Sequence, residues 1–430
     1  MIFLYGLLLR ILVFLFNYSF DVNNHMGWGK ELVLFGFRGF YDRVMYGYTI
    51  DFPNYPPLAY YLFSLGYLID DFFIKTAWFL NTHIPLFPSK MVFLVNSLNF
   101  YAAILKIPYI LADIGIAYLF WKITKRKLAA GLVLFSPVFW YVSALWGQIE
   151  SLAIFFLVLC CFFLVAKKRP VLAVISLALA LLSKQTVIVF VPIFLFLFLR
   201  MYPLKSLIKG MAASYIIFFL AFLPFANGIY GFLFPFEIYF RRILFSSGLP
   251  FVSNHAFNIW PLLIGWNNIR DTNLFGPLPF RVWGYIIAGL AYLLVIFGTL
   301  KNKKISADTL TKAFFLSGFL AFLFLTKIHE RHLLQTLPFL IIMAVKNKKY
   351  LILYFVISTI MLVNFYHNWA WPEVPLLVGL IRNSLTPYFL SPLLLGSFIF
   401  ILRDFLQSDN IVNRSDVNRR RGRLKGKNRN

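Results

Sequence analysis

The chain has 430 residues, of which 60% are hydrophobic and only 13% are charged, and its formal net charge is +25. Soluble domains carry about 45–50% apolar and about 25% charged residues, so this composition excludes an ordinary soluble protein. The basic residues stand in short clusters between apolar runs, which indicates membrane topology and not nucleic-acid binding.

The N-terminal segment, residues 2–16, has the apolar character of a signal-peptide core, but no small-residue cleavage site follows it. We therefore expect a retained first membrane helix. Arg10 within it is costly in lipid, so it either reaches toward the interface or faces other helices. The two cysteines, Cys160 and Cys161, are neighbours inside an apolar run, where we expect them to pack between helices.

Apolar runs close to the roughly 17–25 residues that cross a bilayer recur along the whole chain. They predict an all-α integral membrane protein with about 12–14 transmembrane helices. The expected spans are residues 2–18, 57–73, 89–105, 107–123, 129–145, 149–166, 170–184, 185–200, 210–226, 282–300, 312–327, 332–345, 350–366 and 384–402.

Clusters of Lys and Arg follow every even-numbered span from the fourth onward. They lie at residues 122–127, 167–169, 200–209, 301–304, 346–349 and 414–427. Because cytoplasmic connections carry the excess of positive charge, both termini are predicted to be cytoplasmic and the odd-numbered connections to face outside. A wrong number of spans within the chain would break this alternation. In a bacterium or an archaeon the membrane would be the plasma membrane.

Two of the predicted outer connections are long, residues 19–56 and 227–281, and both are rich in aromatic residues. Connections of this length are usually functional or disordered, and the aromatic content favours short amphipathic helices at the interface. Residues 1–407 would form one membrane domain. The polar, basic tail, residues 408–430, is expected to be disordered and cytoplasmic, either solvated or touching anionic lipid.

Polar residues at the outer ends of the predicted helices are the candidates for chemistry. In the first long connection, Asp21 and Asp51 are carboxylates just outside a membrane helix, where a carboxylate can act as a general base. Asp21 could equally be an interfacial helix cap. The pair Pro56-Pro57 after Tyr55 predicts an extended entry into the next span, because proline disfavours helix in the residue before it.

Further along, Gln148 and Glu150 fall at another outer connection, and Lys184 interrupts a long apolar run. A lysine at mid-helix costs roughly 2.5–3.5 kcal/mol by insertion scales and less near the interface. Lys184 is therefore either a lysine that reaches to the membrane surface or a cation kept for a ligand. Arg241 and Arg242 lie in the second long connection.

The run His329-Glu330-Arg331-His332 places four ionisable residues between Leu-rich segments. Zinc fits poorly because the H-E-x-x-H spacing is absent and no further ligand is near in the sequence. A cation cluster with an internal carboxylate suits an anion such as a phosphate. The alternative is that Glu330 serves only as the buried partner of Arg331.

These candidates are far apart in the sequence and share one predicted side of the membrane. The set consists of Asp21, Asp51, Gln148, Lys184, Arg241, Arg242, His329 and Arg331. An acid that can serve as a base, together with several cations at a membrane surface, suits chemistry on a phosphorylated lipid. Helix packing alone would not require all of them on one side.

At these residues the sequence resembles the multispanning glycosyltransferases of the C-type fold (GT-C), which use lipid-phosphate sugars. It looks most like the glucosyltransferases that act on dolichol-linked oligosaccharides and their bacterial relatives. Five stretches carry the resemblance: Asp21 with Trp28, Tyr55–Tyr61 (Y-P-P-L-x-x-Y), Trp146–Ser151 (W-G-Q-x-[DE]-S), Phe234–Trp260 (F-P-F-x-R … N-x-W) and His329–Arg331 (H-E-[KR]). This chain departs from the pattern in having Asn54 where the family often has Asp, and in a longer gap before Arg241.

The resemblance implies inverting transfer of a hexose from a polyprenyl- or dolichyl-phosphate sugar to an acceptor hydroxyl on a lipid-linked or other glycan. Asp21, or else Asp51, would be the general base. The implied substrate-binding residues are Trp28, Tyr55, Gln148, Lys184, Arg241, Arg242, His329, Glu330 and Arg331, with His329, Arg331 and Lys184 first for the phosphate. No cofactor, metal or nucleic acid is expected. The alternative functions are a flippase or transporter of a lipid-linked or anionic substrate, and a non-catalytic membrane scaffold.

Overall fold

The computed structural model describes residues 1–43, 52–228, 231–245, 249–302 and 304–427, with side chains described as far as residue 407. It is 77% helical and contains no closed sheet. Six helices within these ranges are long and apolar enough to cross a membrane, or seven if one bent pair is counted as a single span. The chain is therefore an all-α, multi-pass membrane protein.

The described residues form two compact units. The first comprises residues 1–191, 202–250 and 361–371, and the second comprises residues 192–201, 251–360 and 372–430. Each of the two has its own buried residues and its own candidate site residues, and they are described here in turn.

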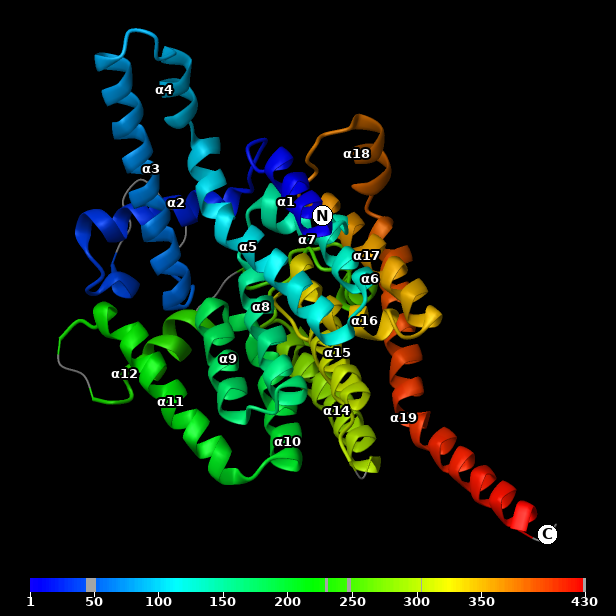
Figure 1. Ribbon diagram of the computed structural model, residues 1–430. Helices are drawn as coiled ribbons and strands as arrows, with labels where there is room; N and C mark the ends of the chain where they lie inside the picture. Colours follow the sequence, from blue (N-terminus) through cyan, green and yellow to red (C-terminus); the bar gives the residue numbers. More distant parts are fainter. Residues whose placement is uncertain (44–51, 229–230, 246–248, 303, 428–430) are drawn as a thin grey trace. The chain divides into compact units, whose positions relative to one another are not determined.

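The first unit begins with α1 (Ile2–Val13), α2 (Phe20–Phe35), the short 3-10 turn η1 (Phe40–Asp42) and α3 (Pro57–His83) (Figure 1). It continues with α4 (Ser89–Val95), α5 (Leu98–Thr124), α6 (Lys127–Leu134), α7 (Pro137–Trp140) and the π-helical turn η2 (Tyr141–Trp146). The remaining elements are α8 (Glu150–Cys161), η3 (Phe162–Ala166), α9 (Pro170–Ser183), η4 (Gln185–Phe190), α11 (Leu204–Phe222), η5 (Leu223–Phe225), α12 (Phe234–Ile238) and η6 (Tyr239–Leu244).

The second unit contains most of α10 (Val191–Met201), then β1 (Ser253–Asn254), α13 (Trp260–Ile264), β2 (Leu274–Phe275) and β3 (Leu278–Pro279). It continues with α14 (Phe280–Lys301), α15 (Ala307–Phe324), β4 (Ile328–His329), η7 (Glu330–Thr336) and α16 (Leu337–Ala344). It ends with α18 (Pro375–Ile381) and α19 (Thr386–Lys427), while α17 (Lys348–Asn368) has residues in both units. The disorder expected for residues 408–430 stays a prediction, although α19 continues to Lys427.

The proline pair of the first long connection acts as its sequence predicts. Pro56 has an extended backbone, with φ −69° and ψ 160°, and Pro57 is the first residue of α3. Proline is favoured at this position because the first helical N–H has no partner within the helix. The extended entry into this helix is confirmed.

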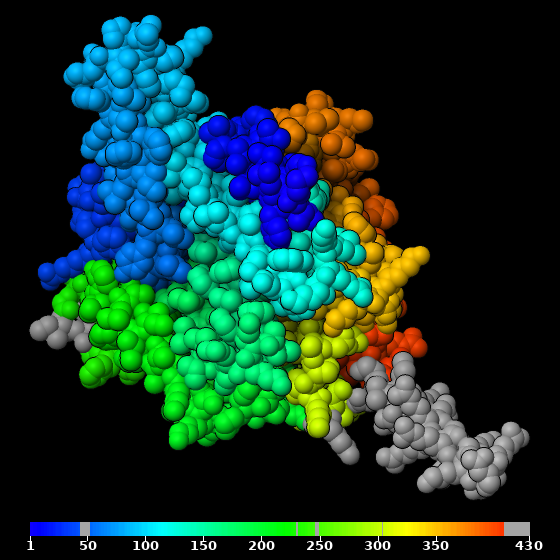
Figure 2. Space-filling model, viewed as in Figure 1, coloured from blue at the N-terminus to red at the C-terminus, as the bar shows by residue number. Residues whose placement is uncertain are grey.

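Two expected spans, residues 89–105 and 107–123, differ from the structure. Their sequence forms the seven-residue α4 and then one continuous 27-residue helix, α5, with Pro108 inside it. Proline is tolerated within a membrane helix when neighbouring helices satisfy the freed backbone groups. The expected spans 2–18, 57–73, 149–166, 170–184, 185–200 and 332–345 are not among the helices that are long and apolar enough to cross, so these spans stay predictions. Figure 2 shows the α3–α4 segment at the surface of the molecule, in light blue, and Leu86 within it is 93% exposed.

A buried charge network holds α1 against α5. The Arg10 guanidinium lies 2.8 Å from Asp113 Oδ2, and both side chains are fully buried. Arg10 also donates to the Leu134 carbonyl oxygen at 2.8 Å, and the Ser143 hydroxyl donates to Asp113 at 2.6 Å. Of the two alternatives for Arg10, the structure shows the one that faces other helices.

The start of the first long connection is fixed by a second buried cation. Lys106, within α5, donates from Nζ to the carbonyl oxygens of Phe14, at 2.8 Å, and of Asn17. These carbonyl groups follow the end of α1, where helical backbone partners are missing. The lysine therefore anchors the segment that leads directly into α2.

Candidate functional site

Asp21 lies in the first turn of α2, which follows Ser19 at the N-cap. The backbone N–H of Ser19 donates to the Trp146 carbonyl oxygen at 2.9 Å, so the start of α2 is tied to the end of η2. The next residue, Gly147, has φ +83°, and a Cβ built there would lie 2.8 Å from Cγ2 of Val22. Only glycine fits both the left-handed backbone and this close approach to α2.

Gln148 reaches Asp21 because of this turn. Its side-chain Nε2 donates to Asp21 Oδ2 at 2.6 Å and to the Ser19 hydroxyl at 3.0 Å, and the glutamine is completely buried. The two hydrogen-bonded residues are 127 positions apart in the sequence. An amide N–H donor and the N-terminal end of a helix both interact favourably with a carboxylate, and the site places both at Asp21.

Lys184 forms a buried ion pair with Glu150. Its Nζ lies 2.7 Å from Glu150 Oε1, and the two side chains are 4% and 0% exposed. The same ammonium lies 3.4 Å from the Tyr55 hydroxyl and 4.9 Å from the centre of that ring. The alternative in which Lys184 reaches to the membrane surface is therefore wrong. Its carboxylate partner argues for positioning Tyr55 over direct binding of a phosphate.

Glu150 is the site residue that was left out of the expected set. It belongs to the W-G-Q-x-[DE]-S stretch. The sequence could have indicated it, because a lysine such as Lys184 within an apolar run is energetically costly. A buried lysine needs a nearby carboxylate, and Glu150 is an acidic residue within an otherwise apolar segment.

Trp28 and Tyr55 belong to an aromatic cluster between α2 and α3. Their ring centres are 5.6 Å apart, and His25 stacks on Phe63 with ring centres 4.4 Å apart. Trp28 is 2% exposed and Tyr55 is 8% exposed. In this arrangement both residues support the site from within the core, and their contact with a substrate stays a prediction.

The first and second long connections meet through Asp42 and Arg242, which form an ion pair. Arg241 lies one residue earlier on η6, with Nη1 at 3.5 Å from Glu237 Oε1. Both guanidinium groups, expected as second choices for a phosphate, thus face carboxylates of this unit. Asp51, the other candidate base, lies outside the described residues.

The second unit holds the His329-Glu330-Arg331 run. The parallel pairing of β4 with β1 places His329 opposite Asn254, and His329 also forms a bridge with His255. His255 has φ +61°, a left-handed conformation. His255 could not be identified from the sequence, since the pairing joins segments that are distant in the chain.

Arg331 lies 2.9 Å from Glu330 Oε1, and Glu330 is completely buried. Burial raises the pKa of the Glu330 carboxyl above its ordinary value, against the opposing effect of the Arg331 guanidinium. The pairing of Arg331 with Glu330 that was considered as an alternative is therefore present.

The N-x-W stretch contacts the end of α15, the helix that precedes this run. The Trp260 indole donates to the Leu325 carbonyl oxygen at 3.1 Å, and the Asn258 side chain accepts from the Trp260 backbone N–H at 3.2 Å. Trp260 is 1% exposed. These contacts hold the second long connection to the end of α15, just before the charged run.

No protein-family model matches the sequence, and no curated protein matches it at a significant level. Among the described residues, no group of three or more His, Cys, Asp or Glu is arranged to hold a metal ion. The first unit contains a carboxylate, Asp21, that is hydrogen-bonded by Gln148. The second contains a buried arginine, Arg331, with histidines on both sides of it in the sequence.

Proposed function

We propose that this protein is an inverting glycosyltransferase that moves a hexose from a polyprenyl-phosphate sugar to an acceptor hydroxyl on the extracytoplasmic face of a membrane. The observation that carries the proposal is the hydrogen bond from buried Gln148 to Asp21. It joins two of the five stretches by which the chain resembles GT-C enzymes, and it prepares the residue that the chemistry needs as a base.

In the proposed reaction Asp21 accepts the proton of the acceptor hydroxyl as its oxygen attacks the anomeric carbon. The bond from that carbon to the phosphate oxygen breaks, and the lipid phosphate leaves with the electron pair. Attack from the side opposite the leaving group inverts the anomeric centre. His329 and Arg331 are proposed to stabilise the charge that develops on the phosphate.

The basic clusters that follow residue 127 support an outer-face position for Asp21, whatever the number of helices before them. Alternation of the basic clusters from residue 127 onward places Gln148 outside. Because Gln148 bonds directly to Asp21, the two residues share a side. If α3 does not cross, the merger of two expected spans into α5 leaves the parity of the later connections unchanged. The fold proposed is GT-C-like, with twelve membrane crossings and two long outer connections.

The decisive experiment is turnover of synthetic polyprenyl-phosphate sugars by purified wild type and Asp21→Asn. Asparagine keeps the shape but cannot accept the proton, so we expect turnover to fall about 10²–10⁴-fold while donor binding persists. Asp71→Asn is the matched control, since Asp71 pairs with Lys75 on the exposed side of α3. Near-normal turnover in Asp21→Asn, with loss in Asp51→Asn, would move the role of base to Asp51.

The same preparation separates an enzyme from a transporter. A transporter would move a lipid-linked sugar across proteoliposomes without changing its covalent structure. Accumulation of free polyprenyl phosphate together with a glycosylated acceptor supports transfer. Movement of intact donor without any such product would replace the proposal.

A further inference from the structure

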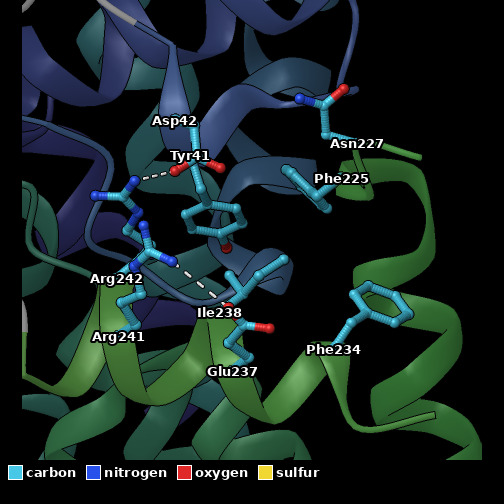
Figure 3. Close-up of a pocket in the computed structure, with 9 residues that line it drawn as sticks. All are labelled: Tyr41, Asp42, Phe225, Asn227, Phe234, Glu237, Ile238, Arg241 and Arg242. Carbon is cyan, nitrogen blue, oxygen red and sulfur yellow. Dashed lines mark hydrogen bonds and ion pairs between the residues drawn. The ribbon is translucent and has the colours of Figure 1, made fainter. Parts of the chain in front are cut away.

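A pocket in the first unit lies where the two long connections meet. Its cavity volume is about 170 Å³, it is partly open to the surface, and nine residues line it (Figure 3). A cavity of about 150 Å³ can hold benzene. The pocket therefore has room for one six-membered ring.

Aromatic rings form one part of the wall. Figure 3 shows Tyr41, Phe225 and Phe234 around the same space, and all three side chains are largely buried. The Tyr41 hydroxyl donates to the Tyr55 carbonyl oxygen at 2.9 Å, so this residue is committed to the fold through its polar end. The three side chains are only 2–5% exposed, so each contributes a small apolar area to the pocket wall.

Polar groups form the rest of the wall, and their charges cancel. Asp42 and Glu237 carry one negative charge each, and Arg241 and Arg242 carry one positive charge each. Figure 3 shows the two ion pairs, Arg242 with Asp42 and Arg241 with Glu237. A phosphate would find each guanidinium already facing a carboxylate. A neutral ligand with many hydroxyl groups can both donate to the carboxylates and accept from the guanidiniums.

From this lining we infer that the pocket binds one ring of a neutral saccharide. The Asn227 amide, which can donate and accept, completes a set of groups suited to hydroxyls. A small number of placed polar groups on an aromatic wall is the usual composition of a small-molecule site. Naming the ring as part of the glycan acceptor rests on the proposed function, whereas binding of a neutral ring does not.

The test uses the full chain in phosphatidylcholine nanodiscs, because maltoside detergents carry sugar rings of their own. The probes are the methyl glycosides of glucose, mannose, galactose and N-acetylglucosamine, and binding is measured by saturation-transfer NMR. Phe234→Leu keeps an apolar side chain but removes the aromatic face, and Asn227→Ala removes the exposed amide. We expect at least one glycoside to bind wild type, and each variant to raise its dissociation constant roughly fivefold or more.

Phe232→Leu is the matched control, because Phe232 is 80% exposed and does not line the pocket. It should bind like wild type. Failure of all four glycosides to bind, or equal binding by Phe232→Leu and Phe234→Leu in variants that remain folded, would overturn the assignment. Displacement of the glycoside by inorganic phosphate at a similar concentration would overturn it as well, since a neutral lining should not prefer an anion.

The outcomes separate this pocket from the reaction. Asp21→Asn should bind the glycoside like wild type. If a glycoside binds with the expected dependence on Phe234 but no polyprenyl-phosphate sugar is consumed, the proposed function fails and the pocket stands. If donor is consumed but no neutral glycoside binds, only the pocket is lost.

Discussion

Buried charges in the first unit are neutralised by partners that lie far away in the sequence. Lys184 and Glu150 are 34 positions apart, and Arg10 and Asp113 are 103 apart. Removing one member of such a pair leaves the other buried without compensation, which is more costly than removing both. The side chains that look most like ligands in the sequence therefore carry part of the fold.

For Lys184 this gives a first prediction. Lys184→Met should destabilise the protein by about 3–5 kcal/mol, because buried Glu150 loses the ammonium group that lies 2.7 Å from its carboxylate. Lys184→Met with Glu150→Leu should recover most of the loss. Thermal unfolding in nanodiscs measures both. Lys75→Met is the control at an exposed pair and should leave the unfolding temperature unchanged. If the single and double variants unfold alike, the pair does not hold the site together.

A second prediction separates folding from donor binding at Arg331. Arg331→Ala should lower the unfolding temperature without donor, because Glu330 loses its partner at 2.9 Å. If Arg331 also holds the phosphate, a polyprenyl-phosphate sugar should stabilise wild type more than the variant. Loss of a charge-assisted bond worth about 1.5–3 kcal/mol raises the dissociation constant of the donor about tenfold to hundredfold. Equal stabilisation by donor in both proteins would remove Arg331 from the phosphate site.

The pH dependence of the same variant has a definite sign. Burial already raises the pKa of Glu330, and losing Arg331 removes the main group that opposes this rise. The folded variant then binds its proton at higher pH than folded wild type does. Its stability deficit should be largest at high pH and shrink as the pH falls through the raised pKa. A deficit that does not change with pH would contradict this account.

Among the secondary-structure elements, the turn at Gly147 decides whether Asp21 and Gln148 meet. A third prediction concerns Gly147→Ala. The left-handed φ of +83° costs an alanine about 1–2 kcal/mol, and its Cβ would also press on Val22 at 2.8 Å. In a Val22→Ala background only the first cost should remain, so the destabilisation should be smaller there. Turnover should fall in Gly147→Ala, because Gln148 is carried away from Asp21.

Sequence reasoning located the elements better than their contacts. Apolar runs located most of the long helices but not α2, and Pro56 with Pro57 predicted the start of α3, because these features depend on neighbouring residues. The division of residues 89–123 was wrong because Lys106, where the two expected spans were separated, lies inside α5 and donates to the carbonyl oxygens of Phe14 and Asn17. The partner of Lys184 and the pairing of His329 with His255 could not be predicted, because nothing local encodes a contact between distant segments.

For the whole molecule, the structure and the sequence lead to different predictions for the side of the membrane on which α4 lies. The sequence alone expects residues 74–88 inside the cell, since it counts residues 57–73 as a span. If α5 crosses and α3 does not, the same residues are outside. A fourth prediction follows for Leu86→Cys in a chain whose Cys160 and Cys161 are replaced: an impermeant thiol reagent added outside should label it. Lys346→Cys, beside a basic cluster, should be labelled only after the membrane is opened.

The Arg10–Asp113 pair also bears on the order in which the chain enters the membrane. Lys106 and Asp113 lie within α5, and each would cost about 2.5–3.5 kcal/mol if it met lipid alone. At twelve residues, α1 is about 18 Å long, shorter than the hydrocarbon layer. Insertion of either helix alone into the membrane is therefore unfavourable. Because Arg10 and Asp113 neutralise each other only when α1 packs on α5, we expect stable insertion of α1 to depend on α5.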